Sequence, residues 1–247
     1  MRRSCRTARP VAAPGGRAHA PPVTGAPTVV VFDVNETLSD LRPLAQRFTD
    51  LGAPAHLARL WFAVLLRDAF ALTAAGAPRR FADLAVDAVH TVLAGVEVDR
   101  SPEDAAAHVV DGFAQLSLHP DVAEGVRALR QAGLRLVTLS NGAASVAERL
   151  LGDAGIRDQF EAVLSVEDAG AWKPARRAYE HAARTCGTEP EQMLMVAVHP
   201  WDVDGAQRAG MRGAWIDRDG GHYPAVLTPP AVTARDLPDL ARRLTSS

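Results

Sequence analysis

Short apolar runs and longer amphipathic segments alternate along most of the chain. Residues 28–32 form the first apolar, β-branched run, which ends abruptly in Asp33 and predicts a strand buried on both faces of a parallel sheet. From Pro120 onward the pattern becomes regular. Expected strands at 134–139, 162–166, 192–198 and 213–216 alternate with expected helices at 121–132, 143–151, 175–186 and 202–209. This alternation predicts right-handed βαβ crossovers and an α/β fold with a Rossmann-like parallel sheet.

A helical region separates the first strand from this regular part. Apolar side chains at helical spacing, interrupted by Gly and Pro, predict helices at 41–51, 55–75, 80–93 and 102–116. We therefore expect a core made of residues 28–40 and 117–247, with an inserted helical cap over residues 41–116. Residues 1–27 are rich in Arg, Ala, Pro and Gly and lack an apolar period, so we expect a disordered extension there.

The net charge of −2 on the 247 residues hides an asymmetry. Residues 1–27 contain five arginines and no acid, which leaves 22 basic against 29 acidic side chains in the remainder. That acidic balance does not suit a nucleic-acid surface, and no apolar stretch is long enough to span a membrane. The two cysteines, Cys5 and Cys186, give no disulfide framework, which favours a cytoplasmic location.

Lysine is almost absent from the sequence, which contains 26 arginines and one lysine, Lys173. The compact ammonium of lysine has rotatable donors, whereas the guanidinium of arginine is a flat fork, so the two cations make different contacts. The single lysine therefore indicates a specific role rather than a surface cation. In open α/β sheets the chemistry takes place beyond the carboxyl ends of the strands. Asp33 at such an end is either a metal ligand or a nucleophile. We expect Lys173 to lie against it.

Four expected strand ends carry polar or charged side chains. These are Asp33 with Thr37, Ser140 with Asn141, Lys173, and His199 with Asp202. With these four motifs in order, the chain from residue 28 resembles the haloacid dehalogenase superfamily. The spacing from Lys173 to Tyr179 and the pair Trp201-Asp202 resemble the type II 2-haloacid dehalogenases within it.

The phosphatases of this superfamily differ at two positions that bear on the chemistry. They carry a second Asp as general acid two residues after the nucleophile, where this chain has Asn35. They also require Mg²⁺, which prefers several oxygen ligands, whereas the strand end before His199 offers no carboxylate until Asp202. Halide leaves carbon as an anion without protonation or a metal. The resemblance therefore implies no metal and no cofactor. A phosphatase, or an inactive binding protein of the same fold, is the alternative.

The resemblance implies a reaction through an aspartyl ester. Asp33 would displace the halogen of a short 2-haloalkanoic acid, and water would then hydrolyse the ester to release a 2-hydroxy acid. Lys173 would keep Asp33 ionised, because a nearby cation favours the charged form, and Thr37 would orient it. Asp202, with His199, would orient or deprotonate the water. The implied partner is the small haloacid, and a homodimer is left open.

The resemblance also implies which residues bind the substrate. Ser140 would hold the substrate carboxylate and Asn141 the departing halide. Trp61 and Phe62 are candidates for the apolar wall that a haloalkanoate needs, although aromatic residues at helical spacing often belong to the core. Two further candidates are Asn35 and Tyr179.

Three departures from the family pattern leave the substrate open. Phe62 follows Leu60-Trp61 where the family has the arginine that grips the halide. The other departures are Asn35-Glu36 in place of Tyr-Gly, and Ala197 and His199 in place of Ser and Asn. We expect Arg67, on the same predicted helix, to replace the missing cation, with Arg59 as the alternative.

Overall fold

A parallel sheet of six strands forms the centre of the computed structural model, which describes residues 26–246. Its strands, in the order β3-β2-β1-β4-β5-β6, are β1 (Val29–Phe32), β2 (Arg135–Ser140), β3 (Ala162–Ser165), β4 (Met193–Ala197), β5 (Arg212–Ile216) and β6 (Val232–Ala234). β1 pairs with β2 on one side and with β4 on the other. The α/β fold with a Rossmann-like sheet is therefore confirmed. The predicted disordered extension lies almost wholly outside the described residues.

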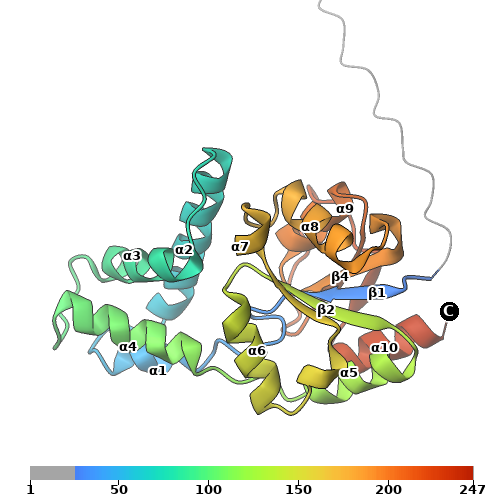
Figure 1. The fold of residues 1–247 in the computed structure, drawn as a ribbon. Helices are drawn as coiled ribbons and strands as arrows, with labels where there is room; N and C mark the ends of the chain where they lie inside the picture. Colours follow the sequence, from blue (N-terminus) through green and yellow to red (C-terminus); the bar gives the residue numbers. More distant parts are fainter. Residues whose placement is uncertain (1–25, 247) are drawn as a thin grey trace, which may run out of the picture.

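Helices cover both faces of this sheet (Figure 1). Successive side chains of β1 point to opposite faces, so Val29 and Val31 pack into one apolar cluster and Val30 and Phe32 into another. The first face is covered by α7 (Val166–Ala169), α8 (Arg176–Cys186) and α9 (Pro200–Arg208). The second is covered by α5 (Val122–Gln131), α6 (Ala144–Asp153) and α10 (Leu237–Thr245). All four side chains of β1 are buried, as its β-branched composition predicts.

The cap is a group of four helices inserted between β1 and α5, and it lies beside the sheet (Figure 1). Its helices are α1 (Leu44–Thr49), α2 (Leu57–Ala74), α3 (Phe81–Leu93) and α4 (Pro102–Ala114). Trp61 of α2 is fully buried, and its indole N–H donates to the carbonyl oxygen of Ala85 at 2.9 Å. At the start of α4, the Ser101 hydroxyl accepts a hydrogen bond from the backbone N–H of Asp104, which satisfies one free donor of the first turn.

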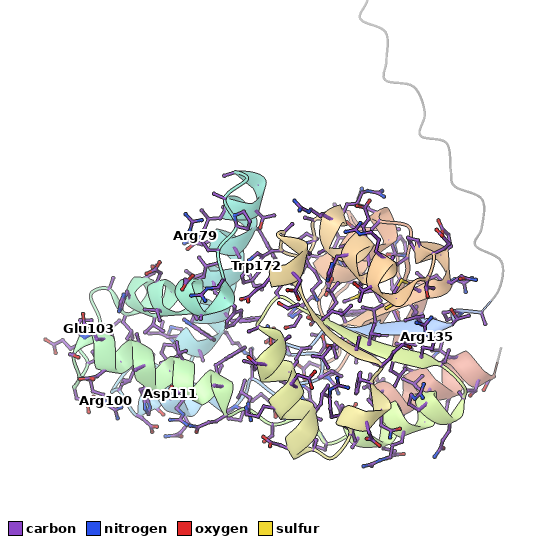
Figure 2. The ribbon with its side chains drawn as sticks, viewed as in Figure 1. Arg79, Arg100, Glu103, Asp111, Arg135 and Trp172 are labelled. Carbon is purple, nitrogen blue, oxygen red and sulfur yellow. The ribbon has the colours of Figure 1, made fainter. Side chains whose placement is uncertain are left out.

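Two hydrogen bonds are among the contacts at the boundary between cap and core. The chain enters the cap near Asp40 and leaves it near Ser117, and these two segments lie side by side. The backbone N–H of Asp40 donates to the carbonyl oxygen of Ser117 at 2.9 Å. On the other side, the indole N–H of Trp172 donates to the carbonyl oxygen of Arg79 at 2.8 Å, and both residues lie at the boundary between cap and core (Figure 2). The cap is thus linked directly to the segment that carries Lys173.

The predicted helices and strands differ from the observed ones mainly at their ends. The larger difference lies after residue 216, where we predicted no element and the structure has β6 and α10. α10 begins at an N-cap, Asp236, whose carboxylate accepts the backbone N–H of Asp239 at 2.7 Å. The one-turn helix α7 directly after β3 was also not predicted.

Candidate active site

The candidate nucleophile lies in the loop that follows the central strand. The backbone N–H of Asp33 donates to the carbonyl oxygen of Val196 at 3.0 Å, which carries the β1–β4 pairing one residue further. Oδ2 of Asp33 accepts the Thr37 hydroxyl at 2.7 Å, and that hydroxyl oxygen accepts the backbone N–H of Val198 at 3.0 Å. Asp33 is only 2% exposed. Thr37 therefore fixes the orientation of a buried carboxylate.

A buried ammonium bridges two carboxylates in this region. Nζ of Lys173 lies 2.8 Å from Oδ1 of Asp33 and 2.7 Å from Oδ2 of Asp202, as the sequence predicts for Asp33. Lys173 and Asp202 are fully buried. Burial alone disfavours the ammonium, but the charges of Asp202 and Asp33 outweigh it and hold the pKa of Lys173 above its ordinary value. Lys173 is therefore a fixed cation beside the candidate nucleophile.

Asp202 is held from its other side by Tyr179. The phenol donates to Oδ1 of Asp202 at 2.7 Å, and burial together with the charge of Asp202 raises the pKa of Tyr179 well above its ordinary value. Burial also raises the pKa of Asp202, against the opposite effect of Lys173. A Cβ atom on Gly205 would lie 2.7 Å from the Tyr179 hydroxyl. Only glycine therefore lets α9 come close enough for this contact.

A histidine at the start of α9 faces Asp33. Nε2 of His199 lies 3.2 Å from the carbonyl oxygen of Asn35, 3.6 Å from Oε2 of Glu36 and 3.7 Å from Oδ2 of Asp33. Its ring stacks on Trp201 with a centroid distance of 5.0 Å and an interplanar angle of 18°. The ring is therefore fixed with one nitrogen directed toward three oxygen atoms.

A cavity of about 1030 Å³ lies between the cap and the loops at the carboxyl edge of the sheet. Arg59 and Phe62 of α2 line it from the cap, and Glu36 and His199 line it from the core. The rings of Phe62 and His199 lie 6.1 Å apart. Asp33 does not form part of this wall. His199 is therefore the side chain that connects the cavity with the candidate nucleophile.

The residues predicted to hold the substrate carboxylate and the halide are buried at the end of β2. The Ser140 hydroxyl accepts the backbone N–H of Gly142 at 2.9 Å, and Oδ1 of Asn141 accepts the backbone N–H of Lys173 at 2.9 Å. Ser140 thus shapes the turn, and Asn141 positions the backbone of Lys173. Asn35 is also buried, and its carbonyl oxygen is the one that faces His199. Their contacts with a substrate stay a prediction.

The structure does not bring Arg67 to the cavity. Its guanidinium pairs with Asp68 at 2.8 Å, and its side chain is 63% exposed. The reason is helical phase, because Arg67 lies six residues after Trp61 and projects from a different face of α2. Arg59 lies three residues before Phe62, shares its face and lines the cavity. Arg59 is therefore the cation that α2 offers there.

Two aromatic candidates for substrate contact also lie away from the cavity wall. Trp61 is fully buried between the cap helices, with its N–H bonded to Ala85. Tyr179 is fully buried and donates to Asp202. Of the aromatic candidates, Phe62 alone lines this cavity. Trp61 thus supports the cap, and Tyr179 positions Asp202.

Two residues near the site were not among the predicted ones. Glu36 has φ of 63°, and among residues 26–246 it is the one non-glycine residue in the left-handed region. Its carbonyl oxygen faces Nε2 of His119 at 2.9 Å. The sequence signal that could have identified Glu36 is its position, because the family pattern has glycine there. His119 carried no sequence signal, because its contact joins residues far apart in the chain.

Residues 26–246 contain no group of three or more His, Cys, Asp or Glu side chains that could hold a metal ion. In the same part of the chain, no helix is long and apolar enough to cross a membrane.

Comparisons with curated proteins point to one family. A family model described as haloacid dehalogenase-like hydrolase matches residues 27–210. The chain is 30% identical over 193 residues to haloacetate dehalogenase H-2 of Moraxella sp. (strain B), covering 77% of this chain and 86% of that protein. It is 27% identical to an (S)-2-haloacid dehalogenase of Pseudomonas putida, covering 88% and 96% of the two chains.

Solved structures give the same result. The L-2-haloacid dehalogenase RSc1362 superposes with a TM-score of 0.83 and 31% identity, covering 90% of this chain and all of that one. A dehalogenase solved as an intermediate complex gives a TM-score of 0.82 and 25% identity, covering 89% and 98%. The residues matched by the family model include Asp33, Lys173 and Asp202. The chain therefore belongs to the haloacid dehalogenase-like hydrolases.

Proposed function

We propose that this hydrolase converts short 2-haloalkanoic acids to 2-hydroxy acids through an ester on Asp33. The observation that carries the proposal is the buried contact of Lys173 with Asp33 at 2.8 Å, with Asn35 where a phosphatase needs an acid. This contact holds Oδ1 of Asp33 and leaves its other carboxylate oxygen for the attack. The names of the related 2-haloacid dehalogenases support the same reaction class.

The first step forms a carbon–oxygen bond and releases halide. A carboxylate oxygen of Asp33 attacks the carbon that carries the halogen, and the halide leaves with the bonding electrons. Oδ1 is held by Lys173, whereas Oδ2 lies on the side of His199. We therefore assign the attack to Oδ2. Thr37 orients this oxygen through its 2.7 Å hydrogen bond.

The second step hydrolyses the ester. Water attacks the carboxyl carbon of Asp33, and the 2-hydroxy acid leaves with Oδ2 as its hydroxyl oxygen. Oδ1 carries the charge of the tetrahedral intermediate, and Nζ of Lys173 is already placed 2.8 Å from it. Asp202, fixed by Tyr179, is the candidate that orients or deprotonates the water. Ser140 and Asn141 remain the candidates for binding the substrate.

The test is halide release from 2-chloropropionate and bromoacetate in the presence of EDTA. We expect release to continue with EDTA, because no step uses a metal. In a single turnover in ¹⁸O water, the first product should carry unlabelled oxygen, and the label should appear in Asp33. Phosphate release from phosphomonoesters that requires Mg²⁺, without halide release, would instead support a phosphatase.

Arg59 should contribute to substrate binding, whereas Arg67 should not. Arg59→Ala removes a cation from the cavity wall, and loss of a charge-assisted contact costs about 1.5–3 kcal/mol. We expect kcat/KM for 2-chloropropionate to fall roughly 10- to 100-fold. Arg67→Ala is the matched control on the same helix, since Arg67 pairs with Asp68 outside the cavity. Equal effects of the two substitutions would contradict this assignment.

A further inference from the structure

Two histidines hold the loop directly after the candidate nucleophile. Nε2 of His199 lies 3.2 Å from the carbonyl oxygen of Asn35, and Nε2 of His119 lies 2.9 Å from that of Glu36. A carbonyl oxygen only accepts hydrogen bonds, so each Nε2 carries a hydrogen. These contacts stabilise a backbone in which Glu36 occupies the left-handed region, a conformation that costs free energy for a non-glycine residue.

The oxygen atoms around Nε2 of His199 are all hydrogen-bond acceptors. Besides the Asn35 carbonyl, its Nε2 faces the carboxylates of Glu36 at 3.6 Å and Asp33 at 3.7 Å. With three acceptors around it, this nitrogen is a donor and not a base. The ring packs between apolar neighbours, Phe62 from α2 and Trp201 from α9.

Behind Asp33 lie Lys173 and Asp202, so the buried group holds two carboxylates and one cation. A second cation on the cavity side of Asp33 would balance that group. Burial raises the pKa of Glu36, and the charge of His199 opposes this effect. The charges of Asp33 and Asp219 also raise this pKa, and that of Arg59 lowers it.

We propose that His199 donates the proton to the leaving hydroxyl oxygen when the Asp33 ester is hydrolysed, and that Glu36 is the positioning residue that keeps this proton on Nε2. This inference rests on the proposed function and assigns a further catalytic role within it. Release of halide needs no acid, but release of a 2-hydroxy acid from an ester does, because an alkoxide is a poor leaving group. Nε2 faces Asp33 at Oδ2, 3.7 Å away, and this is the oxygen that becomes the product hydroxyl.

Atoms and charge balance in this step. Water adds to the carboxyl carbon of Asp33 and gives one proton to Asp202, and the bond from that carbon to Oδ2 breaks. The second water proton is released when the Asp33 carboxyl group ionises again, and both protons return to solvent. Oδ2 takes the proton from Nε2 of His199 and leaves as the hydroxyl of the product, while the water oxygen stays in the carboxylate. His199 regains a proton from solvent through the cavity that it lines. The present distance of 3.7 Å must shorten in the ester complex, as catalytic contacts often do.

The first experiment follows the two steps separately in His199→Gln. Glutamine keeps an N–H donor for Asn35 but has no acidic proton. With 2-chloropropionate we expect a halide burst at nearly the wild-type rate. Ester hydrolysis should slow roughly 100-fold or more, and intact-mass measurement should show the alkylated protein accumulating. His222→Gln, at an exposed position, is the matched control and should behave as wild type.

The second experiment measures the pH dependence of ester hydrolysis in Glu36→Gln. The reaction needs protonated His199, so its rate falls as pH rises. A neighbouring carboxylate favours the protonated ring, so its loss should move this fall to lower pH by roughly one unit. Glu36→Asp should restore part of the shift. Glu189→Gln, an exposed control, should leave the profile unchanged.

The outcomes separate the two proposals. If wild-type protein releases no halide and forms no adduct with any haloacid, the proposed function fails, and this inference fails with it. If the wild type is active but His199→Gln hydrolyses the ester at the normal rate, or loses the halide burst, the role of His199 as acid is wrong. If His199→Gln does not fold, an unchanged pH profile in Glu36→Gln overturns the inference.

Discussion

Asp33→Asn should abolish halide release while leaving the fold intact. The amide is nearly the same size as the carboxylate, but it is a very weak nucleophile and cannot form the ester. The Thr37 hydroxyl and Lys173 still have a polar side chain beside them in this variant, and Lys173 keeps its 2.7 Å contact with Asp202. Activity should therefore drop below detection, whereas the thermal midpoint should change by only a few degrees.

The measurements are halide release under multiple turnover and thermal unfolding followed by circular dichroism. Asp68→Asn is the matched control, because it removes a carboxylate of α2 that pairs with Arg67 outside the cavity. Its activity should equal that of the wild type. Halide release by Asp33→Asn, in protein whose mass shows that the amide is intact, would mean that another group attacks the substrate.

The fold was predictable because its signals are local. A β-branched run marked β1, and the regular alternation after Pro120 marked the parallel sheet. The four cap helices were visible from apolar spacing. β6 was missed because three residues after a Pro-rich segment carry almost no periodicity. α10 was missed although its cap residue, Asp236, precedes a Pro at the helix start.

The candidate site was predictable where one residue carries an unusual signal. Lys173 is the single lysine among 26 arginines, and it lies against Asp33. The choice of Arg59 over Arg67 could have been read from helical spacing, because Arg59 lies three residues before Phe62 and shares its face, whereas Arg67 does not. The position of Tyr179 behind Asp202, and of Glu36 beside His199, likewise follows from tertiary packing that no local pattern records.

Lys173→Met should abolish halide release and destabilise the protein strongly at neutral pH. Methionine fills a similar volume but leaves the carboxylates of Asp33 and Asp202 facing each other without a cation, in a site where both are almost fully buried. Removing one partner of a buried ion pair costs about 3–5 kcal/mol. The free energy of unfolding, measured with urea at pH 7, should fall by this amount.

The difference in free energy of unfolding between the wild type and Lys173→Met should become smaller as the pH falls. Burial raises the pKa of Asp202 above its unfolded value, so the folded protein binds a proton here more readily than the unfolded chain does. Stability from this group therefore rises as pH falls through the folded pKa. Without Lys173, burying the charged carboxylates of Asp33 and Asp202 costs more free energy than in the wild type. Protonation of one carboxylate therefore restores more stability in the variant than in the wild type. Comparing variant and wild type at each pH cancels the other titrating groups.

Lys173→Arg separates the charge of the side chain from its shape. It keeps the cation, so its stability should depend on pH much as the wild type does. The guanidinium is larger than the ammonium, and the position is fully buried, so overpacking should cost about 1–3 kcal/mol. A planar fork also cannot place one point charge between Oδ1 of Asp33 and Oδ2 of Asp202, so most activity should be lost. Full activity of Lys173→Arg would show that any buried cation suffices, and the inference from the single lysine would be wrong.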